Sequence, residues 1–217
     1  MPICFYRYRA MAEKILKVSN LEPFGRGAHR LCYPHPENPD QCIKVIYNAS
    51  KSAKKEIVRE LKYYEVLNRS LKDWRGVPRY YGQVQTDMGT GYVYDLIKNY
   101  DGTPAPTLKN MMQECETKEE AQVILGIFKR LKQYLHDNEI QTLPLQSYNI
   151  LCQKTAPGEY WPVACDNLGE RAGIPITRWL TFLCHRKQER RWKVFMTTPT
   201  VKEFLERFGI NPDTVGK

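Results

Sequence analysis

The sequence predicts an α+β protein with two lobes. Four segments among its first hundred residues have the composition of β-strands: 18–33, 41–47, 77–86 and 91–97. One helical pattern lies among them at 51–72, and a second, at 118–137, begins a half that is mostly helical. Glycine and proline cluster at 99–106, where we expect the two lobes to join.

The positions of the apolar residues justify both helices. In each segment these side chains recur with the 3.6-residue period of a helix and form one stripe. The residues that follow this period are Ile57, Leu61, Tyr64, Asn68 (the polar exception) and Leu71 in the first helix, and Ala121, Ile124, Leu125, Phe128, Leu131 and Leu135 in the second.

Turn signals set the remaining boundaries. The proline-rich run 34–39 separates the first two strands, and 87–90 predicts a hairpin turn between the next two. Short strands are expected at 149–152 and 161–165, followed by a basic helical stretch from about residue 175.

We therefore divide the chain into three parts. Residues 1–17 form an N-terminal extension whose start we expect to be disordered. Residues 18–98 form an N-terminal lobe, with a twisted antiparallel sheet and one helix. Residues 99–217 form a reduced, mostly helical C-terminal lobe that carries the hairpin of the last two short strands.

Composition excludes several classes of protein. The chain has 217 residues, of which 42% are hydrophobic and 26% charged, so disorder, collagen and a coiled coil are excluded. No apolar run approaches the ~20 residues of a membrane helix. The net charge of +9 favours anionic partners without selecting one.

Cysteine usage and the N-terminus predict a reduced, cytoplasmic protein. The seven cysteines are an odd number, and they include no Cys-x-x-Cys pair. Cys32 and His35 have the spacing of metal ligands, but no second pair accompanies them, so we do not expect a metal there. The N-terminus lacks the apolar stretch of a secretory signal, and Met11 is an alternative start to Met1.

The first chemical motif is Gly25-Arg26-Gly27, between strand-like stretches. Glycines let backbone N–H groups approach phosphate oxygens closely, because no side chain intervenes. A Gly-x-Gly is also common in ordinary hairpin turns, so this motif is weak when it is taken alone.

The second and third motifs are an opposite pair of charges. Strand alternation places Lys44 on the face opposite Ile43 and Val45, and a cation on an apolar strand needs a partner. Glu60 lies within the apolar stripe of the following helix, with Glu56 as a second choice. We expect a Lys44–Glu60 ion pair that holds phosphates; the alternative is an edge strand with its lysine turned outward.

The fourth motif is Asn149 with Asp166. Asn149 begins one short strand and Asp166 ends the next, so a hairpin would bring the amide and the carboxylate together at its open end. Oxygen ligands of this kind suit magnesium that carries a nucleotide. The alternative is two polar residues that each cap a loop.

In this order the four motifs are similar to the signature of protein kinases. Much more closely, the chain is identified as a member of the YrbL family of bacterial PhoP regulatory network proteins, over about residues 18–200. The resemblance rests on five strings: 59–64 (RELKYY), 89–95 (GTGYVYD), 148–152 (YNILC), 163–170 (VACDNLGE) and 186–190 (RKQER). It implies a bilobal protein-kinase-like fold in the cytoplasm of Gram-negative bacteria, linked to a two-component stress regulon.

The resemblance also implies a nucleotide site for ATP and Mg²⁺. Most of the implied roles belong to residues already singled out, and the resemblance adds Arg30 and a hinge for adenine. Gly25 and Gly27 would form the phosphate loop, and Arg30 would add positive charge where the third loop glycine is replaced. Lys44 would bind the α- and β-phosphates and pair with Glu60. The hinge would be lined by Asp95, Leu96 and Ile97, and magnesium would be bound by Asn149 and Asp166.

Two departures from the kinase pattern affect activity. The usual catalytic aspartate lies five residues before the metal-binding asparagine, and here that residue is Pro144, while Asp137 lies too early to substitute. No ordinary activation segment is recognisable after Asp166. The resemblance implies an atypical phosphotransferase in a PhoP-linked stress response, or else a catalytically silent pseudokinase that regulates a partner protein.

The basic stretch 185–193 leaves a third, minor alternative, which is nucleic-acid binding. No nucleic-acid-binding motif accompanies it. The simpler interpretation is a solvated helix face, with Trp192, Val194 and Phe195 contributing to the core.

Overall fold

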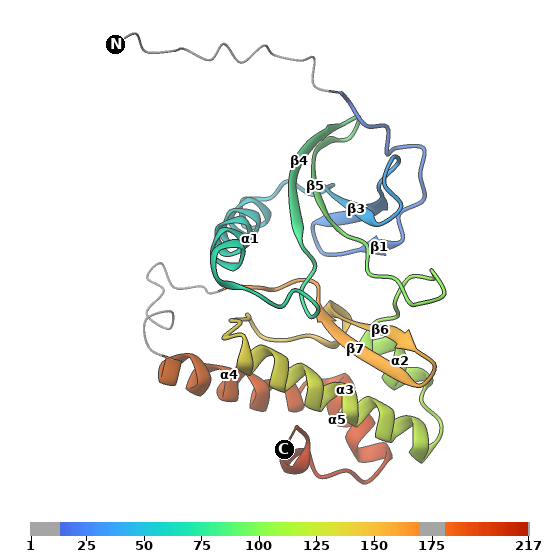
Figure 1. Cartoon of the computed structure of the whole chain (residues 1–217), viewed down its shortest axis with the longest axis vertical. Helices are drawn as coiled ribbons and strands as arrows, with labels where there is room; N and C mark the ends of the chain where they lie inside the picture. The colour runs from blue at the N-terminus through green and yellow to red at the C-terminus, as the bar shows by residue number, and fades with distance from the viewer. Residues whose placement is uncertain (1–13, 170–180, 217) are drawn as a thin grey trace. The chain divides into compact units, whose positions relative to one another are not determined.

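A computed structural model describes residues 14–169 and 181–216, which form two compact units (Figure 1). The first unit holds residues 14–49 and 80–94, and the second holds the other described residues. This division differs from the expected lobe of residues 18–98, because 50–79 belong by their contacts to the second unit. Residues 1–13, where the extension was expected to be disordered, lie outside the described residues.

The first unit is a five-stranded sheet with the strand order β1-β2-β3-β5-β4. Its strands are β1 (Gly25–Arg26), β2 (Arg30–Pro34), β3 (Gln41–Ile46), β4 (Tyr80–Thr86) and β5 (Gly89–Asp95). The pairs β1–β2, β2–β3 and β4–β5 are antiparallel. Thr86 pairs with Gly89, so the predicted hairpin turn is confirmed, with Asp87 and Met88 between the strands.

A small apolar core lies against this sheet. Its buried residues come from three strands and the segment before β1: Leu16, Val18, Tyr33, Ile43, Val45 and Val93. Gly91 passes directly over Ile43, where an added Cβ would lie 2.5 Å from the Cγ2 of Ile43. Any larger residue at position 91 would therefore collide with the Ile43 side chain, which would have to shift within this packed core.

The second unit is mostly helical. Its helices are α1 (Lys51–Ser70), α2 (Leu108–Glu114), α3 (Lys118–Asp137), α4 (Thr181–Met196) and α5 (Pro199–Arg207), with short 3-10 turns at Ser147–Asn149 and Pro212–Thr214. A two-stranded sheet, β6 (Ile150–Ala156) with β7 (Glu159–Ala164), completes the unit. No helix among the described residues is both long enough and apolar enough to cross a bilayer.

Helix α3 is the central element of the second unit. Its start is fixed by a capping box, in which the Thr117 hydroxyl accepts from the N–H of Glu120 and the Glu120 carboxylate accepts from the N–H of Thr117. Phe128, fully buried on this helix, has ring contacts with Trp192 and Phe195 of α4 and with Phe204 of α5. These rings fill the space between three helices.

The predicted α+β class is confirmed, and so are both long helices. The bounds of α3 agree with the prediction at both ends, and α1 ends two residues before the predicted end. Helix α2 was not predicted, since its seven residues span too few turns for a periodic pattern to stand out. One core assignment at the end of the basic stretch was wrong, because Val194 is 50% exposed and does not contribute to the core, whereas Trp192 and Phe195 do.

We expect Phe128→Ala to destabilise the protein strongly. The substitution opens a cavity between three helices, and such truncations cost about 3–5 kcal/mol. Urea unfolding followed by circular dichroism measures this loss. Val123→Ala on the exposed side of the same helix is the control, and a similar loss in both variants would contradict the central role of Phe128.

Candidate functional site

The predicted site residues fall into two groups, one in each unit. In the first unit, Ile43 and Val45 lie in the core and Lys44 is half-buried on the other face of β3. The Lys44 ammonium lies 4.6 Å from the centre of the Tyr94 ring on the neighbouring strand β5. A cation held over an aromatic face keeps a defined position beside the sheet, rather than extending into solvent.

The strand register aligns Lys44 with the glycine motif. Gly25 pairs with Cys32, and Cys32 pairs with Lys44, so the three residues form one row across β1, β2 and β3. A Cβ at Gly25 would lie 3.3 Å from the Cβ of Cys32, which leaves little room for a side chain at this end of the row. A side chain at position 25 would therefore crowd Cys32, which lies between it and Lys44 in this row.

Three hydrogen bonds hold the hairpin turn that follows Gly25. The N–H of Gly27 donates to the Arg30 carbonyl at 2.8 Å, and the Tyr47 hydroxyl donates to the carbonyls of Gly27 and Ala28. One of the amides predicted to receive a phosphate thus has an intramolecular partner. In this respect the turn matches the ordinary hairpin that was the alternative interpretation of the motif.

In the second unit, Glu60 is 5% exposed and lies among the buried residues of α1, between Ile57 and Tyr64. Glu56, the second choice, is exposed. The structure thus distinguishes the two glutamates by burial as the apolar stripe predicted. Because Lys44 and Glu60 belong to different units, their ion pair stays a prediction.

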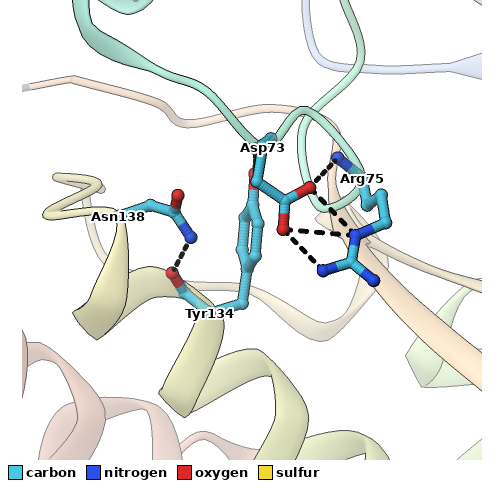
Figure 2. A network of polar contacts seen from close by, with 4 residues as sticks. All are labelled: Asp73, Arg75, Tyr134 and Asn138. Atoms are coloured by element: carbon cyan, nitrogen blue, oxygen red, sulfur yellow. Dashed lines mark hydrogen bonds and ion pairs between the residues drawn. The ribbon is translucent and has the colours of Figure 1, made fainter.

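The segment that follows α1 fixes this helix within the second unit (Figure 2). The Tyr134 hydroxyl of α3 donates to the Asp73 carbonyl at 2.6 Å, and Gly76 lies against the Tyr134 ring so closely that a Cβ would be 2.3 Å from it. Burial raises the pKa of Tyr134 to about 12, so its hydroxyl stays protonated. Arg75, which binds the Asp73 carboxylate, also covers the ring of Trp161 on β7.

The hairpin β6–β7 brings Asn149 and the residue before Asp166 together. Ile150 pairs with Ala164, and the N–H of Cys165 donates to the Asn149 carbonyl at 3.0 Å. The backbones of both predicted magnesium ligands therefore meet at the open end of the hairpin. Both residues are half-buried, and each offers a side-chain oxygen of the kind that magnesium prefers.

Asp166 begins a tight turn that pairs with the segment after α3. Asn167 has φ of 60° and donates its N–H to the Asp166 carboxylate at 2.8 Å. The N–H of Leu143 donates to the Asn167 carbonyl at 2.8 Å, and Thr142 forms an antiparallel bridge with Leu168. The turn and the segment 141–143 thus form one small ladder beside the hairpin.

Pro144 follows this ladder directly. It is half-buried between the buried residues Leu143 and Leu145, so it lies on the path from the ladder to Asn149. Asp137 is the exposed last residue of α3, where it accepts a hydrogen bond from Gln133 at 2.6 Å. None of the five residues between Leu143 and Asn149 has a carboxylate side chain.

Two of the three predicted hinge residues accept hydrogen bonds from the backbone of other segments. The Asp95 carboxylate accepts from the N–H of Arg79 at 2.7 Å, and the Ile97 carbonyl accepts from the N–H of Ala105 at 3.0 Å. Leu96 and Ile97 are half-buried. The contact of these residues with adenine stays a prediction, as does the added charge of Arg30.

Metal-ligand clusters of the ordinary protein kind are absent from the described residues. No group of three or more His, Cys, Asp or Glu side chains converges in residues 14–169 and 181–216. The Nδ1 atom of His35 accepts from the N–H groups of Glu37 and Asn38, so this ring nitrogen has backbone partners. One carboxylate and one amide fit magnesium that also takes phosphate oxygens.

The basic stretch 185–193 lies on α4. Its exposed residues are Arg186, Glu189, Arg190 and Lys193, whereas Trp192 is buried against Phe128. Glu189 forms an ion pair with Lys132 of α3 at 3.1 Å. The stretch is a solvated helix face with a buried apolar side, which was the simpler of the two interpretations.

Comparison with known proteins matches most of the chain. The model of the family described as PhoP regulatory network protein YrbL matches residues 16–200. The YrbL proteins of Escherichia coli K12 and Shigella flexneri are each 46% identical over 193 residues, which are 89% of this chain and 92% of theirs. Among solved structures, a double mutant of the Mycobacterium tuberculosis PknI kinase domain has a TM-score of 0.46 at 15% identity, over 67% of this chain and 56% of that one.

We expect Asp73→Asn to lower the free energy of unfolding only at pH values where the Asp73 carboxyl of the wild type is ionised. Hydrogen bonds from the Arg75 side chain lower the pKa of Asp73, so the folded state favours the ionised carboxyl. This stabilisation is present above the unfolded pKa of about 3.9 and is lost as the pH falls through the lowered folded value.

Urea unfolding of both proteins at about pH 7 and about pH 3 measures the difference. At the higher pH the wild type should be more stable than the variant, but only slightly, because exposed ion pairs contribute little. This difference in the free energy of unfolding should become smaller at the lower pH. An equal difference at both pH values would show that the effect does not depend on the charge of the Asp73 carboxylate.

Proposed function

The chain belongs to the YrbL family of PhoP regulatory network proteins, and from that premise we propose that it binds ATP with magnesium and transfers phosphate slowly. The observation that carries the proposal is the β6–β7 hairpin, with Asn149 before it and Asp166 after it. Lys44 on β3 and the buried Glu60 on α1 occur in the order in which kinases hold a nucleotide.

The chemistry of each residue follows from its surroundings. Lys44, held over Tyr94, supplies a localised positive charge for phosphate oxygens. Asp166 and Asn149 supply oxygen ligands at one end of a rigid hairpin, where magnesium would neutralise the charge of the triphosphate. Phosphoryl transfer depends mostly on such positioning and electrostatic stabilisation, so a slow reaction needs no further group.

We expect Lys44→Ala and Asp166→Ala each to weaken MgATP binding about tenfold or more. A hydrogen bond to a charged group contributes roughly 1.5–3 kcal/mol, and 1.4 kcal/mol is a factor of ten in affinity. Isothermal titration calorimetry with ATP, with and without magnesium, measures both effects.

Lys17→Ala and Asp213→Ala are matched controls, because each removes an exposed charge of the same sign from the same unit. Only Asp166→Ala should lose the magnesium-dependent part of the affinity. Equal binding by all five proteins, or no binding by the wild type, would refute the proposal.

A second candidate is a silent pseudokinase that regulates a partner protein through nucleotide binding. Pro144 favours it, because the residue five before Asn149 has no carboxylate that could accept a proton from an acceptor hydroxyl. In this case the nucleotide binds at the hairpin as a ligand, and its phosphate is not transferred.

Pro144→Asp distinguishes the two candidates. Under the first, the new carboxylate should raise phosphate transfer from labelled ATP about 10²–10⁴-fold, the usual contribution of a general base. Pro144→Asn is the control, because it restores the N–H without the carboxylate. Transfer by the wild type that disappears in Asp166→Ala would refute the silent alternative.

A further inference from the structure

We propose that Tyr63 of α1 is a positioning residue, which clamps the Asp166–Gly169 turn to the segment after α3. This inference rests on the proposed function, because the turn carries the predicted magnesium ligand Asp166. The three segments lie far apart in the sequence and belong to the same compact unit.

The first contact of the clamp is a hydrogen bond. The backbone N–H of Gln141 donates to the Tyr63 hydroxyl oxygen at 2.7 Å. Gln141 is 5% exposed, so no solvent is available to replace this acceptor. An unsatisfied buried N–H is costly, and the hydroxyl therefore determines where residue 141 lies.

The second contact is a close approach of backbone to ring. Gly169 passes over Tyr63 so that an added Cβ would lie 3.1 Å from the Tyr63 Cβ and 3.2 Å from its Cγ. Gly169 also has φ of +99°, a conformation that residues with side chains rarely adopt. The backbone angle thus favours glycine strongly at this position, and a side chain there would also fit only tightly against Tyr63.

The third contact closes a triangle. The N–H of Gly169 donates to the Gln141 carbonyl at 2.9 Å, so Tyr63, Gln141 and Gly169 each contact the other two. From this triangle the ladder runs through the Thr142–Leu168 bridge to Asn167, whose N–H binds the Asp166 carboxylate. A shift at residue 63 is therefore transmitted to the predicted metal ligand through backbone pairs.

The segment after α3 has supports on a second side. The Gln141 side-chain amide contacts the Cys184 sulfur of α4 at 2.6 Å, and the Gln188 amide donates to the carbonyls of Leu135 and Ile140. Because these contacts hold residues 135–141 from α4, loss of the Tyr63 hydroxyl should loosen the ladder locally without unfolding the unit. Glu60 lies one turn before Tyr63 on the same helix, so the clamp also limits where the backbone of residue 60 lies.

Tyr63→Phe tests the clamp, because it keeps the ring under Gly169 and removes only the hydroxyl. Amide hydrogen exchange, followed by NMR, should accelerate about tenfold or more at Gln141 and Gly169, and stay unchanged in the core of α3. MgATP affinity should fall about threefold to tenfold while affinity for ATP without magnesium stays the same. Tyr100→Phe removes a hydroxyl from a 56% exposed tyrosine of the same unit, so it should change neither the exchange rates at Gln141 and Gly169 nor the affinity for MgATP.

Unchanged exchange at Gln141 and Gly169 would overturn the clamp. Faster exchange with an unchanged magnesium-dependent affinity would leave Tyr63 a purely structural residue and would also overturn the proposal. A wild type that fails to bind MgATP would refute the proposed function instead. Because hydrogen exchange is measured on the protein without a ligand, it would still test the clamp in that case.

Discussion

The backbone pairing between 141–143 and 167–169 is the constraint on which the second unit depends. Three contacts form it, namely Gly169 to Gln141, Leu143 to Asn167, and the Thr142–Leu168 bridge. It joins the end of α3 to the end of β7, so it closes a loop that contains the whole β6–β7 hairpin. The two predicted magnesium ligands lie inside this closed loop, and their separation is limited by it.

The pairing explains why unusual backbone conformations are tolerated here. Asn167 and Gly169 both have positive φ, which turns the chain sharply just after Asp166. Asparagine is one of the few residues with a side chain that adopt this region readily, and glycine has no penalty at all. Because the ladder supplies partners for the buried amides on both sides, the turn is held at a low energetic cost.

Much of this arrangement follows from the sequence, and the limits are physical. The alternation around Lys44 and the apolar stripe around Glu60 each depend on one element, so local periodicity was sufficient to find them. Residue spacing likewise indicated the hairpin with Asn149 and Asp166. Tyr63 occupies an unremarkable position beside the stripe, and its role arises from contacts with Gln141 and Gly169, which no local pattern encodes. Similarly, the N–H of Gly27 is satisfied by Arg30 through a turn geometry that two glycines alone do not specify.

Pro144 and the ladder together define what chemistry the second unit can support. The ladder ends at Leu143, so residue 144 begins the path to Asn149 at a fixed point of the backbone. A proline there adds rigidity, because its φ is restricted, and it removes both a carboxylate and an N–H. Positioning and electrostatic stabilisation supply most of the catalysis in phosphoryl transfer, and both can remain without a general base. Under the proposed function, a site of this construction would favour binding of a nucleotide over its rapid turnover, a property that both proposed candidates share.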